Sequence, residues 1–246
     1  ESIRAMQQIQ QNNGERGSNR YIISNCRTLE NILELFAMCR ISGWKEPTLD
    51  FIPLFETIPD LKRAGEIMKD LFNNPVYQNH LKGRKNKQTV MLGFSDGTKD
   101  GGYFMANWSI YKAKEVLSEL ATEYGISMAF FDGRGGPPAR GGGNTHEFYA
   151  SMGDIIQNDD IQLTIQGQTI SSNFGTLDSS QFNLEQLLSS GISNKILNPG
   201  KNNLSPEDRA TMQEMADYSY QVYQDFKEHD MFIPYLERMS TLPYYA

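Results

Sequence analysis

The chain has 246 residues, of which 39% are hydrophobic and 11% aromatic, which suits one large domain or two small ones with a real core. Its formal net charge of -7 argues against a general nucleic-acid binder, which needs a basic surface to replace the counterions of phosphates. The sequence has no apolar run of membrane-spanning length and no signal-peptide pattern. Its two cysteines, Cys26 and Cys39, lack the spacing of a metal site, so we expect reduced or buried thiols in a cytoplasmic protein.

Helix-like and strand-like patterns alternate along the first two thirds of the chain. The opening residues, ESIRAMQQIQQ, have a helical pattern but no initiator methionine, so we expect a piece of a longer protein. Short apolar runs, each typical of a strand, follow at 20–26, 48–56, 88–94, 126–131 and, as a possible fifth, 161–165. The segments between them have helical periodicity, and after residue 177 the pattern is wholly helical.

The composition and spacing of these runs predict an α/β fold. Apolar residues occupy both faces of the runs, which indicates a parallel sheet covered by other elements on both sides. The runs begin roughly 30–40 residues apart, which is the spacing of βα units in a barrel or a doubly wound sheet. Since only four or five units are present, we expect a partial barrel or an open sheet over residues 1–177, with a helical region at 178–246 packed on it.

Three of the runs end at or just before an acidic residue, namely Glu56, Asp96 and Asp132. Because the carboxyl ends of parallel strands form the ligand-binding edge of such folds, these three carboxylates are placed to meet at one point. Oxygen ligands of this kind suit a hard cation such as Mg²⁺ or Mn²⁺, which keeps waters and substrate oxygens in its other positions. The alternative is that each acid only caps the helix that follows it.

A lysine accompanies these acids in the segment GFSDGTKDGGYF, which we interpret as a glycine-rich turn between a strand and a long helix. Lys99 offers a point charge to a phosphate or an enolate, and Gly101 and Gly102 allow backbone N–H groups to approach a ligand. The segment does not match GxxxxGK[ST], so a nucleotide-binding P-loop is not expected. The alternative for a lone lysine in such a turn is that it is simply solvated.

The stretch FDGRGGPPARGGGNT directly follows the fourth run and precedes a helical pattern, so we expect a loop at the ligand-binding edge instead of a disordered tail. Its glycines, Gly135 and Gly136 among them, permit close packing against a ligand. Arg134 and Arg140 can each bind a carboxylate or phosphate through two parallel hydrogen bonds. Together with Lys99 and a metal ion, these groups suit a small, doubly anionic substrate.

Three segments carry specific motifs: PLFETIPDL at 53–61, MLGFSDGTKDGG at 91–102 and FDGRGGPPARGGGNTH at 131–146. In order and spacing they closely resemble motifs of the phosphoenolpyruvate carboxylase family. Those motifs are P-L-F-E-T-x-x-D-L, M-[ILV]-G-Y-S-D-S-x-K-D-x-G and F-H-G-R-G-G-x-x-x-R-G-G-G-x-T-H. The resemblance is clear over about residues 20–150 and weaker to about 240.

The resemblance implies a fold and a reaction. The fold is a TIM-type (β/α)8 barrel embedded among many helices, in a chain several times this length, so the present chain would hold a partial barrel with an added C-terminal helical region. The protein would be a cytoplasmic, allosteric homotetramer. The reaction is the anaplerotic carboxylation of phosphoenolpyruvate by bicarbonate, giving oxaloacetate and phosphate, with Mg²⁺ or Mn²⁺ as cofactor.

The resemblance also implies roles for the motif residues. Glu56 and Asp96 would be metal ligands, and Lys99 would be the active-site lysine. Arg134, beside Gly135 and Gly136, would bind the substrate phosphate. Arg140 would contact phosphate or the carboxyphosphate intermediate and, in the inhibited state, an acidic effector such as aspartate or malate.

The chain departs from the family motifs at Asp132, which stands in place of a histidine. A carboxylate beside anionic bicarbonate hinders this chemistry unless Asp132 joins the metal shell, so Asp132 is kept as a candidate catalytic residue. At 161–175, IQLTIQGQTISSNFG lacks an arginine and two acids of the family pattern. Family segments that carry further catalytic and inhibitor-binding residues are not in this chain, so we expect the isolated chain to be inactive.

Two other functions stay open. Asp132 also suits a family member that has lost carboxylation and binds an anionic metabolite in order to regulate a partner. An RGG-type RNA-binding protein fits the arginine and glycine content, but the acidic net charge and the flanking strand and helix oppose it.

Overall fold

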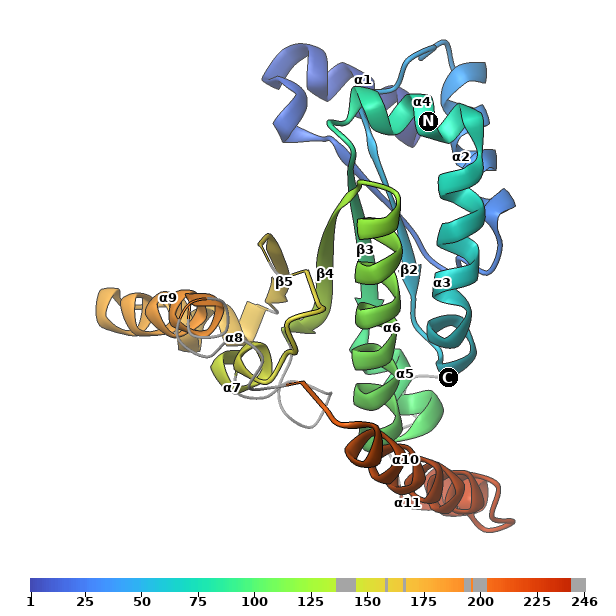
Figure 1. Cartoon of the computed structure of the whole chain (residues 1–246), viewed down its shortest axis with the longest axis vertical. Coiled ribbons are helices and arrows are strands. Elements are labelled where there is room, and N and C mark those ends of the chain that lie inside the picture. The colour runs from blue at the N-terminus through green and yellow to red at the C-terminus, as the bar shows by residue number, and fades with distance from the viewer. Residues whose placement is uncertain (136–144, 158, 166, 193–195, 197–202, 240–246) are drawn as a thin grey trace.

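The computed structural model describes residues 1–135, 145–157, 159–165, 167–192, 196 and 203–239. Its centre is a sheet of five parallel strands in the order β1-β2-β3-β4-β5, which curls as half of a barrel (Figure 1). Because the strand order follows the chain without a reversal, the sheet is a partial (β/α)8 barrel and not a doubly wound sheet. All five predicted strands are confirmed: β1 (Arg20–Ile23), β2 (Asp50–Phe55), β3 (Lys87–Gly93), β4 (Ser127–Gly135) and β5 (Ile161–Ile165).

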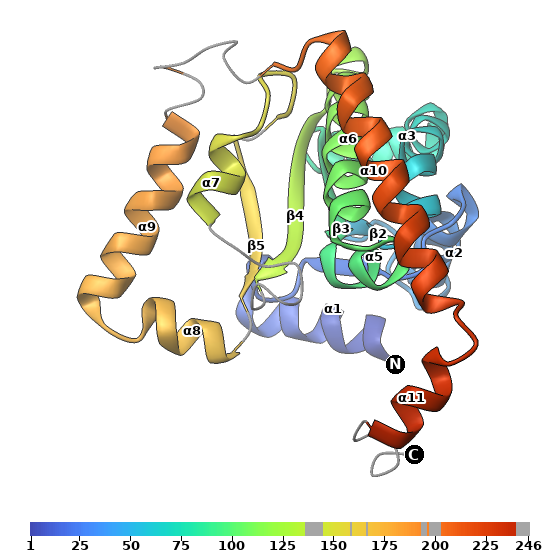
Figure 2. The ribbon, with the colours of Figure 1, turned by 90° about the horizontal axis from the view of Figure 1, so that it is seen from below.

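Helices connect the strands, and a further set of helices follows the sheet. α1 (Ser2–Asn13) and the 3-10 helix η1 (Glu15–Gly17) precede β1. The connecting elements are α2 (Leu29–Ile41), α3 (Ile58–Asn73), α4 (Pro75–Gly83), α5 (Phe94–Gly101), α6 (Tyr103–Glu123) and α7 (Thr145–Ala150). After β5 come α8 (Gly167–Phe174), α9 (Leu177–Ile192), α10 (Pro206–Lys227) and α11 (Phe232–Met239). α10 packs along α6 and touches α5, whereas α9 packs against α7 (Figure 2). The division into two regions at residue 177 stays a prediction.

The main core lies between the sheet and helices α2, α3 and α6. It includes Phe51 and Phe55 of β2, and both cysteines are fully buried in it as free thiols. Burial raises the pKa of Cys26 to about 12 and that of Cys39 to about 11, so both thiols stay protonated and unreactive at neutral pH. Within the described residues, no helix has the length and apolar character needed to cross a bilayer.

The segment after β3 is a helix, α5, so its interpretation as a glycine-rich turn was wrong. Gly93, which precedes α5, and Gly97 within it allow close packing. A Cβ atom added at Gly93 would lie 3.1 Å from the Cα of Glu56, and one at Gly97 would lie 3.1 Å from the Glu56 carbonyl oxygen. The turn comes later, at Gly102, where a φ of 78° separates α5 from α6. The glycine-rich sequence therefore lets α5 lie directly against the end of β2.

We predict that His80 makes the fold sensitive to acid. The ring of His80 lies among Phe36, Phe51 and Tyr77, at 5.0–5.6 Å between ring centroids, and burial is the main cause that lowers its pKa from 6.5 to about 4. Because the folded state binds the proton more weakly than the unfolded state, stability falls as the pH drops from about 6.5 to about 4. The expected loss is about 2–3 kcal/mol.

Urea unfolding of wild type and His80→Phe at pH 7.5 and pH 4.5 measures this effect. The variant is expected to lose less stability at pH 4.5 than wild type does. His229→Gln is the matched control, because His229 is exposed. An equal acid-induced loss in wild type and His80→Phe would show that His80 is not responsible.

Candidate active site

The parallel strands place the predicted site residues along one edge of the sheet. Glu56 directly follows β2, Asp96 and Lys99 lie in α5 directly after β3, and Arg134 lies near the end of β4. α5 lies at this carboxyl edge, whereas α1 and α4 lie at the opposite edge of the sheet (Figure 1). Parallel β/α folds bind their ligands at the carboxyl edge.

Two carboxylates and a lysine form a cluster at the ends of β2 and β3. The side chains of Glu56 and Asp96 are close enough to share a hydrogen bond. Burial is the largest cause that raises the pKa of Glu56, the backbone N–H of Asn25 at 3.4 Å opposes it, and the charge of Asp96 adds to it. Lys99 Nζ donates to Asp96 Oδ1 at 2.9 Å, and both side chains are at least half exposed. Three predicted residues thus meet at a place open to solvent.

This cluster owes its position to the start of α3. Thr57 and Asp60 form a capping box, in which each side chain accepts a hydrogen bond from the backbone N–H of the other residue at 3.3 Å. The capping box fixes the chain directly after Glu56. Glu56 and Asp96 are two neighbouring carboxylates, and carboxylate oxygens are the donors that a hard divalent cation takes.

Asp132 lies apart from this cluster. Its side chain is 1% exposed, and Oδ2 accepts hydrogen bonds from Lys114 Nζ at 2.8 Å and from the Tyr149 hydroxyl at 2.7 Å. The expectation that three carboxylates meet is therefore wrong, because Asp132 faces α6 and α7 instead. Within the described residues, no group of three His, Cys, Asp or Glu side chains is arranged to hold a metal ion.

Lys114 is the residue that the sequence interpretation missed. It lies in α6 with its side chain 2% exposed, and its Nζ is 5.1–5.6 Å from the ring centroids of Phe130, Phe148 and Tyr149. Burial is the main cause that lowers its pKa, and the Asp132 carboxylate opposes this effect. The signal was present in the sequence, since Lys114 follows Ile110 by four residues and so falls on the apolar face of a helix.

Arg134 is a buried cation that makes no ion pair with a carboxylate among the described residues, although the charge of the Asp132 carboxylate acts on it. It is 5% exposed, and its guanidinium carbon lies 3.8 Å from the Phe148 ring centroid and 5.7 Å from that of Phe94. Its Nε and Nη1 atoms are buried and make no hydrogen bond within the described part of the chain. Burial is the main cause that lowers its pKa. Aromatic faces hold the guanidinium in place while its donors stay available to an anion.

The rest of the predicted loop is described only in part. Gly135 ends β4, where it pairs with Ile165 after an irregularity in the strand register. Gly136 and Arg140 lie outside the described residues. The structure therefore brings together Glu56, Asp96 and Lys99, places Arg134 on the next strand along the same edge, and leaves the position of Arg140 a prediction.

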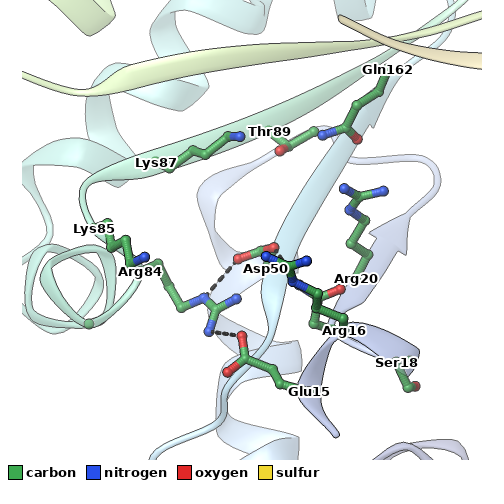
Figure 3. A pocket seen from close by; sticks show the side chains of 13 residues that line it. Glu15, Arg16, Ser18, Arg20, Asp50, Arg84, Lys85, Lys87, Thr89 and Gln162 are labelled. Atoms are coloured by element: carbon green, nitrogen blue, oxygen red, sulfur yellow. Dashed lines mark hydrogen bonds and ion pairs between the residues drawn. The ribbon is translucent and has the colours of Figure 1, made fainter. Parts of the chain in front are cut away.

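A second group of charges lines a cavity of about 930 Å³ at the opposite edge of the sheet (Figure 3). Arg84 lines this cavity and makes ion pairs with Asp50 at 2.8 Å and with Glu15 at 2.7 Å. Asp50 and Lys87 are the first residues of β2 and β3, so this cavity lies at the amino ends of the strands. Side chains at that edge of a β/α barrel serve stability, so the cavity is not the candidate active site.

The fold and the site together define a class of protein, namely a partial (β/α)8 barrel that carries a carboxylate pair, a lysine and a buried arginine at the carboxyl ends of its strands. The chain belongs to the phosphoenolpyruvate carboxylase family, since the model of the family described as "Phosphoenolpyruvate carboxylase" matches residues 1–243. The resemblance found in the three motifs is thereby confirmed.

Curated relatives have the same name. Proteins called "Phosphoenolpyruvate carboxylase" from Corynebacterium efficiens and Corynebacterium diphtheriae are 37% and 35% identical to this chain, over 90% and 93% of its length. One from Trichormus variabilis is 31% identical over 98% of the chain. In each case the chain spans only 25–26% of the relative's length.

Proposed function

We propose that this chain forms part of the active site of a phosphoenolpyruvate carboxylase. The observation that carries the proposal is the cluster of Glu56, Asp96 and Lys99 at the carboxyl edge of a partial barrel. The relatives' names give carboxylation of phosphoenolpyruvate as the activity, and the family resemblance implies that bicarbonate is the co-substrate and that oxaloacetate and phosphate are the products. Because the chain spans about a quarter of those relatives, we expect the isolated chain to be inactive.

The donor set at the cluster fits a divalent cation. Glu56 and Asp96 would hold Mg²⁺ or Mn²⁺, which bind two carboxylates readily when waters and substrate oxygens complete the shell. When bound, the ion supplies positive charge that stabilises the charge developing on the substrate oxygens. Lys99 makes an ion pair with Asp96, so its ammonium group stays next to the proposed metal ligands.

The cations of the chain suit the charge that the reaction moves. The phosphoryl group passes from the enol oxygen to bicarbonate, which leaves an enolate and carboxyphosphate; carboxyphosphate then yields CO₂ and phosphate, and the enolate carbon bonds to CO₂. We assign Arg134 to the transferring phosphoryl group, because its buried donors Nε and Nη1 have no other partner among the described residues. Lys99 would stabilise the enolate oxygen, and Arg140 would contact phosphate or carboxyphosphate.

The alternative function is a family member that binds an anionic metabolite without carboxylating it. The burial of Asp132 with Lys114 favours this alternative. Asp132 stands where the family motif has a histidine, and as a buried, paired carboxylate it offers no proton to a bound substrate. Binding of an acidic effector at Arg140, assembly as a homotetramer and a cytoplasmic location are further parts of the proposal that rest on the family.

A coupled assay for oxaloacetate on the full-length protein separates the two functions. With phosphoenolpyruvate, bicarbonate and Mg²⁺, we expect turnover that Lys99→Ala lowers about 10²-fold or more and that metal chelation abolishes. Lys69→Ala is the matched control, because Lys69 is an exposed lysine of α3. Binding of phosphoenolpyruvate with Mg²⁺ but without any oxaloacetate would establish the binding module instead.

A further inference from the structure

Three side chains near the end of α10 bind the last turn of α5. The Tyr223 hydroxyl donates to the Lys99 carbonyl oxygen at 3.0 Å, and Gln224 Nε2 donates to the Asp100 carbonyl oxygen at 2.7 Å. Lys227 Nζ donates to both carbonyl oxygens, at 3.2 Å and 3.3 Å. Residues more than 120 positions apart in the chain therefore meet, and α10 lies beside α5 in both views (Figures 1 and 2).

These carbonyl groups need partners from outside α5. The last carbonyls of a helix have no partner in the helix itself, and Gly102, with a φ of 78°, turns the chain away into α6 directly afterwards. A Cβ atom at Gly102 would lie 3.2 Å from Cγ of Tyr223, so the ring packs directly on this turn. α10 thus serves as a C-terminal cap of α5, provided by a distant part of the chain.

The contact extends from α5 to the other elements of the site. Lys99, whose carbonyl α10 binds, pairs through its side chain with Asp96 at 2.9 Å. Asp100, whose carbonyl α10 also binds, accepts through Oδ2 a hydrogen bond at 2.9 Å from the backbone N–H of Ile58, the first residue of α3. Ile58 follows Glu56 by two residues. One helical turn therefore connects α10 to Glu56, Asp96 and Lys99.

We propose that Tyr223, Gln224 and Lys227 are positioning residues for the carboxylate and lysine cluster. Their hydrogen bonds to α5 go to its backbone carbonyl oxygens, so they act by holding the backbone of α5, and through Asp100 the start of α3, in place. The consequence for catalysis rests on the proposed function, whereas the consequence for the structure of the cluster does not.

Hydrogen exchange in the full-length protein tests the structural part. The double variant Gln224→Leu/Lys227→Met removes three of the four hydrogen bonds, and we expect amide exchange over residues 94–101 to become about tenfold faster. Gln221→Leu is the matched control, since the side chain of Gln221 donates to Asp225 within α10, at 2.7 Å, and not to α5. The milder change Tyr223→Phe, with the exposed Tyr218→Phe as control, serves if the double variant does not fold.

Metal binding and kinetics test the link to the site. The double variant should bind Mn²⁺ about tenfold more weakly than wild type and have a lower kcat with phosphoenolpyruvate. Lys227→Arg, which keeps a hydrogen-bond donor at position 227, should retain most of the wild-type Mn²⁺ affinity and kcat. Unchanged exchange over 94–101 would overturn the proposal, and so would equal acceleration in Gln221→Leu. Faster exchange with unaltered Mn²⁺ affinity would overturn the positioning role. If wild type makes no oxaloacetate, the proposed function fails, while exchange and Mn²⁺ binding still decide this proposal.

Discussion

Asp132→Asn is expected to lower the free energy of unfolding by about 3 kcal/mol or more, because it leaves the Lys114 ammonium buried without a counter-charge. Lys114 and Asp132 are 2% and 1% exposed, and their 2.8 Å ion pair is surrounded by aromatic rings. Breaking such a pair costs far more than breaking one at the surface, where water replaces the lost partner. Urea unfolding at pH 7 measures the difference between wild type and variant.

Two controls separate the buried pair from general effects of charge. Asp160→Asn breaks the same kind of pair with Lys87, but at the surface, where both side chains are more than 40% exposed, so we expect less than about 1 kcal/mol. The double variant Lys114→Met/Asp132→Leu removes both charges and should recover most of the lost stability. Equal losses in Asp132→Asn and Asp160→Asn would contradict the assignment of a structural ion pair.

The pair also predicts the effect of restoring the family residue. Asp132→His leaves Lys114 and Arg134 as buried cations with no carboxylate from β4, so it is expected to reduce both stability and any carboxylation rate. On this account, the expected role of Asp132 is to neutralise these two buried cations and keep them ordered. A large gain in rate for Asp132→His would instead show that Asp132 damages the site.

Arg134→Met is expected to have opposite effects on stability and on activity. Arg134 is 5% exposed, and two nitrogen atoms of its guanidinium have no partner within the described residues, so removing the guanidinium should raise the free energy of unfolding by about 1–2 kcal/mol. Because these donors are assigned to the transferring phosphoryl group, kcat/KM for phosphoenolpyruvate should fall by about 10³. Urea unfolding and steady-state kinetics on the same preparation measure both effects.

The matched control is Arg40→Met in α2. Arg40 also places its guanidinium over a ring, at 4.9 Å from the Phe36 centroid, but it is an exposed residue away from the carboxyl edge. We expect both stability and activity to change little in this variant. A stability loss in Arg134→Met comparable to that of a core substitution would mean that the guanidinium is held for packing and not for a ligand.

The sequence predicted the sheet well because its strands are short apolar runs at regular spacing. Every strand has the expected position, and the acidic ends of β2 and β3 do meet. The segment around Lys99 was misjudged because the four glycines of GFSDGTKDGGYF suggested a turn. In the structure, Gly97 and Gly101 give α5 a surface without side chains that lies directly against the end of β2 and the start of α3.

The surroundings of Asp132 were not predicted, because they depend on a contact between distant residues that no local sequence pattern shows. The position of Asp132 at a strand end predicted a metal ligand, but its orientation is set by Lys114, which lies 18 residues earlier and reaches the strand only when α6 packs on the sheet. The same holds for α10, whose bonds to the carbonyl oxygens of α5 join residues 124–128 positions apart. Periodicity identifies a helix, but it does not identify the backbone groups that its side chains will bind.

The most direct test of the proposed function follows the carbon and the phosphate together. The full-length protein is supplied with phosphoenolpyruvate, Mg²⁺ and ¹³C-labelled bicarbonate, and the labelled oxaloacetate and the free phosphate are measured over time. We predict that wild type forms labelled oxaloacetate and phosphate in equal amounts. Lys99→Ala should form each product at only a small fraction of the wild-type rate. Phosphate release without labelled oxaloacetate, or no turnover of bound phosphoenolpyruvate, would contradict the assignment of carboxylation to this site.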